Sequence, residues 1–329
     1  MLKSMKSKRI FMMLICLLMI WIAGTFGPLK PYIQVVKQGN NTAEALQIEQ
    51  TANGDLLSWL RQEAVSQTIP AIDAVNDRIW KAIPGYEGRE VDIQATYRKF
   101  VESGFDRTTQ SHNIPWVYKV IKPKVELNDL PPLPVFRGNP SKPMVAFMIN
   151  VAWGDEHLQP MLDTLEKANV HATFFFDGKW LSSHTEMAKE IIARGHEASN
   201  HAYSHPDMSK LGEARQREEI DKTEQLLKKL GVTNRWFAPP SGDYSQLTVK
   251  IAAEQGLRTV LWTLDTIDWK NPPSWSVVAK VKAKVGAGTL ILMHPTAASA
   301  GALDGMIKAI KSKGYELGTV SETLSSTRL

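Results

Sequence analysis

Residues 144–178 read MVAFMINVAWGDEHLQPMLDTLEKANVHATFFFDG, and this stretch decides the fold. An apolar run of strand length (144–149) is followed by an amphipathic stretch (158–168) and by a second apolar run (172–176). Strands that alternate with amphipathic helices are typical of a parallel sheet built from βα units. The alternation continues downstream, with strands expected at 196–200, 235–237, 258–263, 289–293 and 315–320 and helices at 186–193, 213–230, 245–254, 277–285 and 303–312. The sequence therefore predicts an α/β barrel of seven strands.

The chain before this region is organised differently. Residues 131–143 hold five prolines, which block helix and central strand alike and predict a linker. A small α+β module is expected at 56–130, with helices at 72–83 and 93–101 and a strand at 115–121. Residues 28–55, polar from Gln38 onward, are predicted to be a tether. The barrel domain then spans 144–325.

The first 27 residues have the pattern of an export signal. An apolar run, Ile10–Ile22, follows a basic head that contains Lys3, Lys6, Lys8 and Arg9. The basic side is expected to stay cytoplasmic, which places everything after about Pro28 outside the membrane. Ala23-Gly24-Thr25 is a weak cleavage site, so a membrane anchor is favoured over a cleaved signal peptide that would release a secreted protein.

Composition narrows the possible chemistry. The formal net charge is +5, but without the four basic residues of the head 35 basic residues face 34 acidic ones. Such a balanced body offers no basic surface for nucleic acid. The single cysteine, Cys16, lies in the apolar segment after Ile15, where a lipidation site requires a small residue. The exported part thus has no disulfide, thiolate zinc site or thiol nucleophile, and metal chemistry must come from histidines and carboxylates.

Polar residues follow one predicted strand after another. In α/β barrels the loops at the carboxyl ends of the strands share one mouth, so these residues are expected to lie near one rim. They are Asn150, Asp155, Glu156, Asp177, His201, His205, Asp265, Asp268 and His294.

Each of these groups has a functional and a structural interpretation. His201 and His205 could bind one divalent metal with a carboxylate as third ligand, or they could be solvated or capping histidines. His294 could be a satisfied rim residue, or a general acid whose pKa is set by Asp265 or Asp268. Trp153 and Trp269 could form the floor of a groove on which sugar rings stack, although buried aromatic residues are commoner.

Four ordered motifs resemble the polysaccharide deacetylase family, whose domain is called NodB homology. They are His-Ala-Thr-Phe-Phe (171–175), Gly-His-Glu-Ala-Ser-Asn-His-Ala-Tyr-Ser-His (195–205), Asp-Thr-Ile-Asp-Trp (265–269) and Leu-Met-His (292–294). The resemblance runs from about Met144 to Leu324 and implies a distorted seven-stranded barrel. Asn150-Val151-Ala152-Trp153-Gly154 and the upstream module resemble the sporulation-associated branch of spore-forming bacteria.

The resemblance also implies a mechanism, from which this sequence departs. In the family an Asp-His-His site holds zinc or a similar ion that polarises the acetamide carbonyl and activates a water, and a second Asp is the base. The match puts Asn150 at the base and Val151 at the metal carboxylate. The family's Arg-Pro-Pro, whose arginine orients the base, becomes Ala238-Pro239-Pro240, of which the prolines stay expected substrate contacts.

What the resemblance retains is His201 and His205 as metal ligands and His294 as acid, with an aspartate behind it. Two imidazoles alone make a weak site, so zinc or another divalent metal is expected to bind weakly or not at all unless a nearby carboxylate replaces the missing ligand. The candidates for that replacement are Asp155, Glu156 and Asp177.

Two functions follow from these residues. One is weak, metal-dependent hydrolysis of acetamide C–N bonds in an N-acetylated cell-wall glycan such as peptidoglycan. The alternative is an inactive pseudoenzyme that binds cell-wall glycan during sporulation. In both, the partners are the glycan and, through the N-terminal segment, the membrane.

Overall fold

The computed structural model describes residues 55–103 and 114–329, which form two compact units. The predicted export segment and nearly all of the tether lie outside these residues. Of the described residues, the first unit contains 55–67, 91–103 and 114–117, and the second contains the rest. Residues 68–90 and 118–130 thus group with the sheet domain. Within the described ranges, no helix is sufficiently long and apolar to cross a membrane.

The first unit is mainly helical. Residues 55–64 are helical and lead into a 3-10 turn, Val65–Gln67. The predicted helix at 93–101 is present as α4, Ile93–Glu102, and the Asp92 carboxylate caps it by accepting the Ala95 N–H at 2.9 Å. The rings of Trp59 and Phe100 meet edge to face, with centroids 6.1 Å apart.

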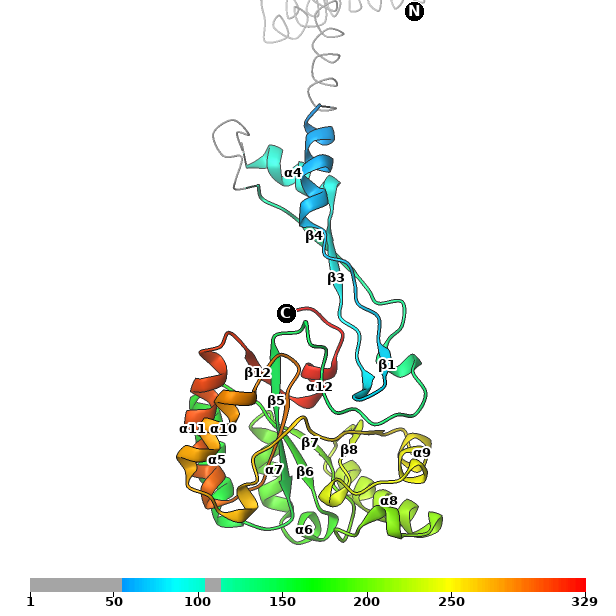
Figure 1. Ribbon diagram of the computed structural model, residues 1–329, viewed down its shortest axis with the longest axis vertical. Helices are drawn as coiled ribbons and strands as arrows, with labels where there is room; N and C mark the ends of the chain where they lie inside the picture. The colour runs from blue at the N-terminus through cyan, green and yellow to red at the C-terminus, as the bar shows by residue number, and fades with distance from the viewer. Residues whose placement is uncertain (1–54, 104–113) are drawn as a thin grey trace, which may run out of the picture. The chain divides into compact units, whose positions relative to one another are not determined.

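A parallel sheet organises the second unit (Figure 1). The strand order is β10-β11-β5-β6-β7-β8-β9, and β12 pairs with the first half of β5. The strands are β5 Met144–Val151, β6 Thr173–Phe176, β7 Glu197–Asn200, β8 Trp236–Phe237, β9 Arg258–Thr259, β10 Leu264–Asp265, β11 Leu290–Met293 and β12 Glu316–Gly318. All seven predicted strands are present, and β10 is an additional one. The predicted α/β fold with a parallel sheet is confirmed.

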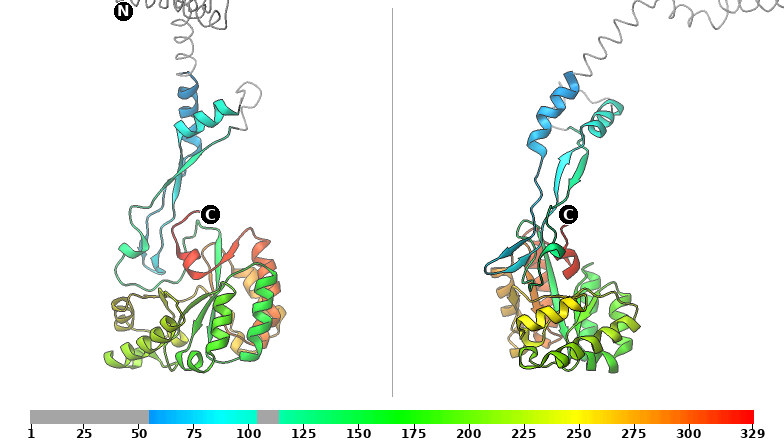
Figure 2. Two further views of the ribbon diagram at one scale, coloured as in Figure 1. Left: turned by 180° about the vertical axis from the view of Figure 1, so that it is seen from behind. Right: turned by 90° about the vertical axis from the view of Figure 1, so that its right-hand side faces the viewer.

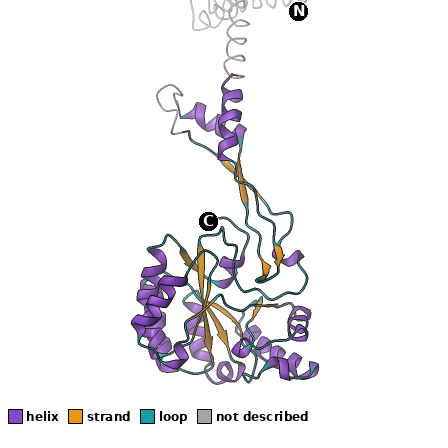
Figure 3. Ribbon diagram, viewed as in Figure 1, coloured by secondary structure: helices purple, strands orange, loops and turns teal. Residues whose placement is uncertain are grey.

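Helices pack around this curled sheet (Figures 2 and 3). Helix α10 packs on α11 and α11 on α5, while α6 and α9 both pack on α8. All eight residues of β5 are buried, because both faces of this central strand are covered. The helices are α5 Asp155–Lys167, α6 Gly178–Ser183, α7 Thr185–Ala193, α8 Glu213–Lys229, α9 Gln246–Glu254, α10 Ser274–Lys284, α11 Ala297–Lys311 and α12 Val320–Leu324.

The proline-rich segment 131–143 packs into the sheet domain as well as connecting to it. Val135 is fully buried; it donates its N–H to the Thr259 carbonyl at 3.0 Å and accepts the Leu261 N–H at 2.8 Å. Arg137 forms an antiparallel bridge with Thr289, next to β11. The neighbouring prolines lack the N–H that a longer strand requires, so the segment pairs only at single residues.

The predicted helix at 72–83 is wrong. These residues contain the hairpin of β1, Val75–Asp77, and β2, Lys81–Ile83. At the turn the Asp77 carboxylate accepts the N–H groups of Ile79 and Trp80, which competes with helix formation. A second ribbon joins β3, Gly88–Val91, to β4, Tyr118–Ile121. Tertiary pairing and turn chemistry therefore override the helical spacing of apolar residues in this segment.

Candidate functional site

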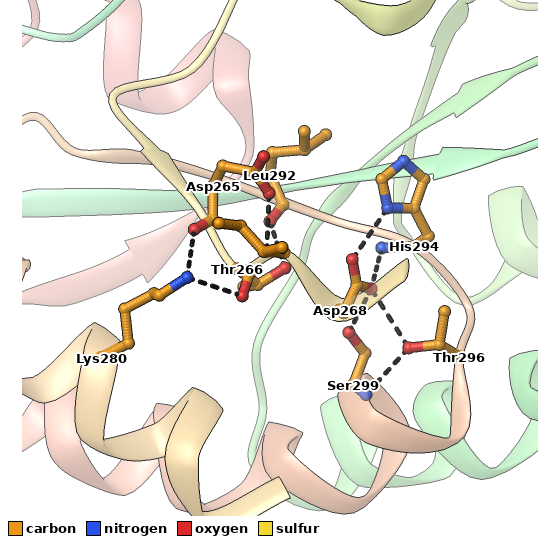
Figure 4. A network of polar contacts seen from close by, with 9 residues as sticks. Asp265, Thr266, Asp268, Lys280, Leu292, His294, Thr296 and Ser299 are labelled. Carbon is orange, nitrogen blue, oxygen red and sulfur yellow. Dashed lines mark hydrogen bonds and ion pairs between the residues drawn. The ribbon is translucent and has the colours of Figure 1, made fainter. Parts of the chain in front are cut away.

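The partly buried His294 and the fully buried Asp268 form a pair beyond the carboxyl end of β11 (Figure 4). The His294 ring donates from Nδ1 to Asp268 Oδ1 at 2.9 Å, and the His294 backbone N–H donates to Oδ2 at 2.7 Å. The hydroxyls of Thr296 and Ser299 donate to the same Oδ2. Burial alone would raise the pKa of Asp268, but the bonds from His294 and Ser299 outweigh it and hold the pKa below its usual value. The pair leaves Nε2 of His294 for a second partner.

Asp265, the other carboxylate considered as a partner of His294, has a different role. Its Oδ1 accepts the Ile267 N–H at 2.7 Å and so caps the turn that leads to Asp268. Figure 4 shows it away from the His294 ring. Among the described residues, Asp268 is the acidic partner of this histidine.

Two exposed tryptophans come from the loops around this pair. The Trp153 ring lies parallel to the His294 ring, with centroids 5.8 Å apart and planes at 9°. Trp153 is 47% exposed and Trp269 is 53% exposed, so neither is a core residue. The Lys270 ammonium lies 4.9 Å from the Trp269 ring centroid. Flat aromatic surfaces that remain open to solvent can stack on sugar rings.

His201 and His205 also approach one another. Their ring centroids are 5.1 Å apart, and the planes meet at 72°. The His201 Nδ1 contacts the Ala238 carbonyl at 2.7 Å, which directs Nε2 toward the other side of the ring. Burial, with the nearby charges of His205 and His294, lowers the pKa of His201 to about 3. His201 is therefore neutral, as a metal ligand would be.

Glu219 of α8 fixes the loop that carries this pair. Its buried carboxylate accepts the backbone N–H groups of Tyr203 and Ser204 at 3.1 and 2.8 Å, and the Ser204 hydroxyl at 2.8 Å. Arg215 Nη2 donates to it at 2.6 Å. The loop includes a non-glycine residue with positive φ, His205 at 55°, so it depends on such bonds. Glu219 was not predicted from the sequence, since nothing in a helical glutamate marks it as facing a loop.

Asn150 and Val151, which are expected from the sequence at the positions of the two missing carboxylates, end β5. Asn150 is 4% exposed, and its side-chain oxygen is buried with no hydrogen-bond partner. Val151 is fully buried and belongs to the hydrophobic core. Ala238, expected at the position of the family arginine, and the prolines after it are also buried. The residue expected at the position of the metal carboxylate is therefore apolar and closed to solvent.

The three substitute carboxylates have other partners. Asp155 contacts Trp180 Nε1 and lies 3.1 Å from His184 Nε2, while Glu156 lies 3.6 Å from His157 Nε2. Asp177 caps α6 through the Trp180 N–H at 2.9 Å. Burial raises the pKa of Asp177, while this bond and the nearby charge of His205 oppose the rise. The backbone that follows Asp177 bonds to the loop of the histidine pair, since the Gly178 N–H donates to the Ala202 carbonyl at 2.9 Å.

These residues do not form a three-ligand metal site like the Asp-His-His site of the family. Across residues 55–103 and 114–329 there is no cluster of three or more His, Cys, Asp or Glu side chains able to hold a metal ion. A divalent zinc site normally requires at least three protein ligands. The site has an intact histidine–aspartate pair and two further histidines, but no carboxylate that completes a metal centre.

Comparison with known proteins agrees with these motifs. Residues 137–260 match the family model described as polysaccharide deacetylase. The chain is 46% identical over 281 residues to the uncharacterized protein YlxY of Bacillus subtilis, covering 85% of this chain and 86% of that protein. It is 33% identical to a peptidoglycan-N-acetylglucosamine deacetylase of Bacillus cereus, covering 59% of this chain and 72% of that protein.

A solved structure is similar over most of its length. A CE4 family pseudoenzyme from Bacillus anthracis is 40% identical, with a TM-score of 0.76 over 83% of this chain and 96% of that chain. A mutant of that protein, described as having restored enzymatic activity, superposes on this chain with the same TM-score, and the match covers 99% of the mutant's chain. The motifs, the fold and these similarities together show that the chain belongs to the polysaccharide deacetylase family.

Proposed function

We propose that this protein is a catalytically inactive deacetylase homologue that binds the N-acetylated glycan of the cell wall. The observation that carries the proposal is the buried, apolar Val151 at the metal-carboxylate position, next to Asn150 at the base position. Without a third ligand, an ion that polarises the acetamide carbonyl has no adequate site. The similar Bacillus anthracis protein, described as a pseudoenzyme, supports this choice over weak catalysis.

Binding of a glycan rests on the parts of the site that are retained. Trp153 and Trp269 expose about half of their surface beside the His294–Asp268 pair. His294 can still form a hydrogen bond with a sugar hydroxyl or acetamide group, because its charge partner is in place. The peptidoglycan deacetylases among the similar proteins make an N-acetylated glycan the first ligand to test. We take the curled sheet to be the family's distorted seven-stranded barrel.

Acetate release and metal content test the loss of catalysis. The wild-type ectodomain is expected to release no acetate from N-acetylglucosamine oligomers with zinc, cobalt or nickel, and to hold no stoichiometric metal. The Asn150→Asp/Val151→Asp/Ala238→Arg variant is expected to gain both properties. Adding His201→Ala to that variant should abolish them again. Acetate release by the wild type at a rate that His294→Ala abolishes would overturn the proposal.

Binding requires a separate measurement. Trp153→Ala and Trp269→Ala are each expected to weaken binding of N-acetylglucosamine oligomers about tenfold, because stacking on an aromatic ring contributes on the order of 1 kcal/mol or more. Trp275→Ala is the matched control, since this tryptophan is 73% exposed on α10 and was not assigned to the groove. Absence of any oligomer binding by the wild type would exclude the glycan as ligand. An extracytoplasmic, anchored location and a role in sporulation stay predictions from the sequence.

A further inference from the structure

A cavity of about 860 Å³ lies at the amino-terminal ends of β8 and β9. We call it the β8–β9 cavity. Its wall includes Arg235 and Trp236 at the start of β8, Arg258 at the start of β9, and residues of α9 and α12. His201, Ala238 and His294 follow the opposite, carboxyl-terminal ends of their strands. The cavity is therefore separate from the site described above, and its function does not depend on the proposed glycan binding.

Two arginines are adjacent in this wall. β8 and β9 are parallel with Trp236 opposite Arg258, and the Arg258 N–H donates to the Arg235 carbonyl at 2.9 Å. Neither guanidinium takes part in an ion pair formed within the described residues. Two like charges that no ion pair engages raise the affinity of the cavity for anions.

Arg258 is also short of hydrogen-bond acceptors. Its Nη2 has one long contact, 3.4 Å to the Leu130 carbonyl, and its Nη1 is buried without any partner. Burial lowers the pKa of Arg258, and no acidic neighbour offsets this effect. A half-buried guanidinium with so few acceptors in the protein is costly, and an anion in the cavity would offset part of this cost.

The one acidic side chain in the wall is already engaged. Glu126 accepts the Ser326 hydroxyl at 3.1 Å and caps the short 3-10 helix η2, Leu127–Asp129. Within the described residues, its carboxylate forms no ion pair with either arginine. The wall of the β8–β9 cavity therefore carries two guanidinium groups and one carboxylate, a net positive charge.

The rest of the wall combines apolar and polar side chains. Its apolar part includes Leu130, Leu133, Val249 and Leu257, and its polar part consists of Asn128, Thr259, Ser321, Ser325 and Ser326. The volume lies within the range of small-molecule sites and exceeds what a bare inorganic ion fills. We propose that the β8–β9 cavity binds an organic oxyanion, in which a phosphate or carboxylate head group lies against Arg235 and Arg258 and a sugar-sized carbon body lies against the apolar wall.

Three probes with one hexose body test this proposal in the full chain by calorimetry. They are glucose 6-phosphate, glucuronate and neutral glucose, each measured at two salt concentrations. One or both anions are expected to bind, more weakly at high salt, and glucose is expected not to bind. The stronger of the two anions identifies the head group. Equal binding of all three, or no binding of either anion at millimolar concentration, would overturn the proposal.

Variants localise the binding. Arg258→Gln and Arg235→Gln are each expected to weaken anion binding at least about tenfold, because a hydrogen bond to a charged group is lost. Arg217→Gln on α8 is the matched control, since this arginine is paired with Glu213 and Glu254 outside the cavity wall. Arg235 is exposed, so its replacement keeps the test valid if Arg258→Gln fails to fold. Unchanged affinity in a folded Arg235→Gln protein would refute the assignment, whereas N-acetylglucosamine binding at the carboxyl-terminal rim should be unaffected.

Discussion

Replacing Val151 by aspartate tests whether a single apolar side chain prevents metal binding. Val151 is fully buried at the end of β5, so the new carboxylate has no access to water in the metal-free protein. An unpaired charge at such a site costs about 3–5 kcal/mol. For a domain of this size each kcal/mol corresponds to about 2–4 °C, so we expect Tm to fall by about 6–20 °C without metal.

Zinc should reverse much of this loss. If the new carboxylate joins His201 and His205, zinc at a hundred times its Kd stabilises the folded variant by about 2.7 kcal/mol, or about 5–10 °C. Thermal unfolding followed by circular dichroism, with zinc or with a chelator, measures both effects. His205→Ala in the same background should remove the recovery while leaving the initial loss.

Val151→Asn is the matched control, because asparagine has nearly the shape of aspartate but supplies no charge to the ion. It should lower Tm and show no recovery beyond the small zinc effect on the wild type. Equal recovery in the aspartate and asparagine variants, or none in either, would refute the reasoning that the histidine pair is positioned for a metal and lacks only its carboxylate.

Three further changes probe the groups around this site and the domain that supports it. Asp268→Asn should lower the free energy of unfolding by about 2–4 kcal/mol in urea titrations, because a buried carboxylate that accepts four hydrogen bonds is lost. Asp265→Asn should change it by less than about 1 kcal/mol, because the Asp265 carboxylate accepts one hydrogen bond at a turn. Glu219→Gln should weaken zinc binding by Val151→Asp at least threefold in calorimetry, whereas Glu218→Gln on the exposed side of α8 should not. Burial lowers the pKa of Lys142 to about 8, so the folded protein holds fewer protons than the unfolded chain between pH 8 and 10.5. As pH rises through that window, the free energy of unfolding of the wild type should increase by up to about 3 kcal/mol relative to that of Lys142→Met.

The sheet was predictable because its signal is local. Each apolar run of β5, β6 and β11 is buried on both faces, and such strands appear in the sequence as continuous hydrophobic segments. The hairpin at 75–83 was not predictable in this way. Its apolar residues have helical spacing, and the turn depends on Asp77 accepting two backbone N–H groups, an interaction that periodicity does not include.

The site shows the same division between local and tertiary information. His294 stands out because it directly follows the apolar strand β11, and His201 and His205 stand out as a closely spaced pair after β7, whose rings the structure places 5.1 Å apart. The sequence left open whether Asp265 or Asp268 is the acidic partner of His294. The answer depends on which carboxylate points toward the histidine, and two aspartates three residues apart give no local signal of that orientation. Thr296 and Ser299, which complete the bonding of Asp268, resemble an ordinary helix start in the sequence.

The unpartnered oxygen of Asn150 links the separate losses in this site. A buried amide oxygen without a donor costs about 1–3 kcal/mol, whereas a buried carboxylate without its arginine would cost more. With alanine at position 238, asparagine is thus the less costly residue at position 150, and with asparagine there, a buried arginine would lack its counter-charge. Each substitution reduces the penalty of the other. The same reasoning applies to Val151, since an uncharged residue is favoured wherever no ion neutralises a carboxylate. The His294–Asp268 pair is free of this constraint because its own hydrogen bonds satisfy it without metal or base, which explains physically how it persists in a site that has lost the other charges.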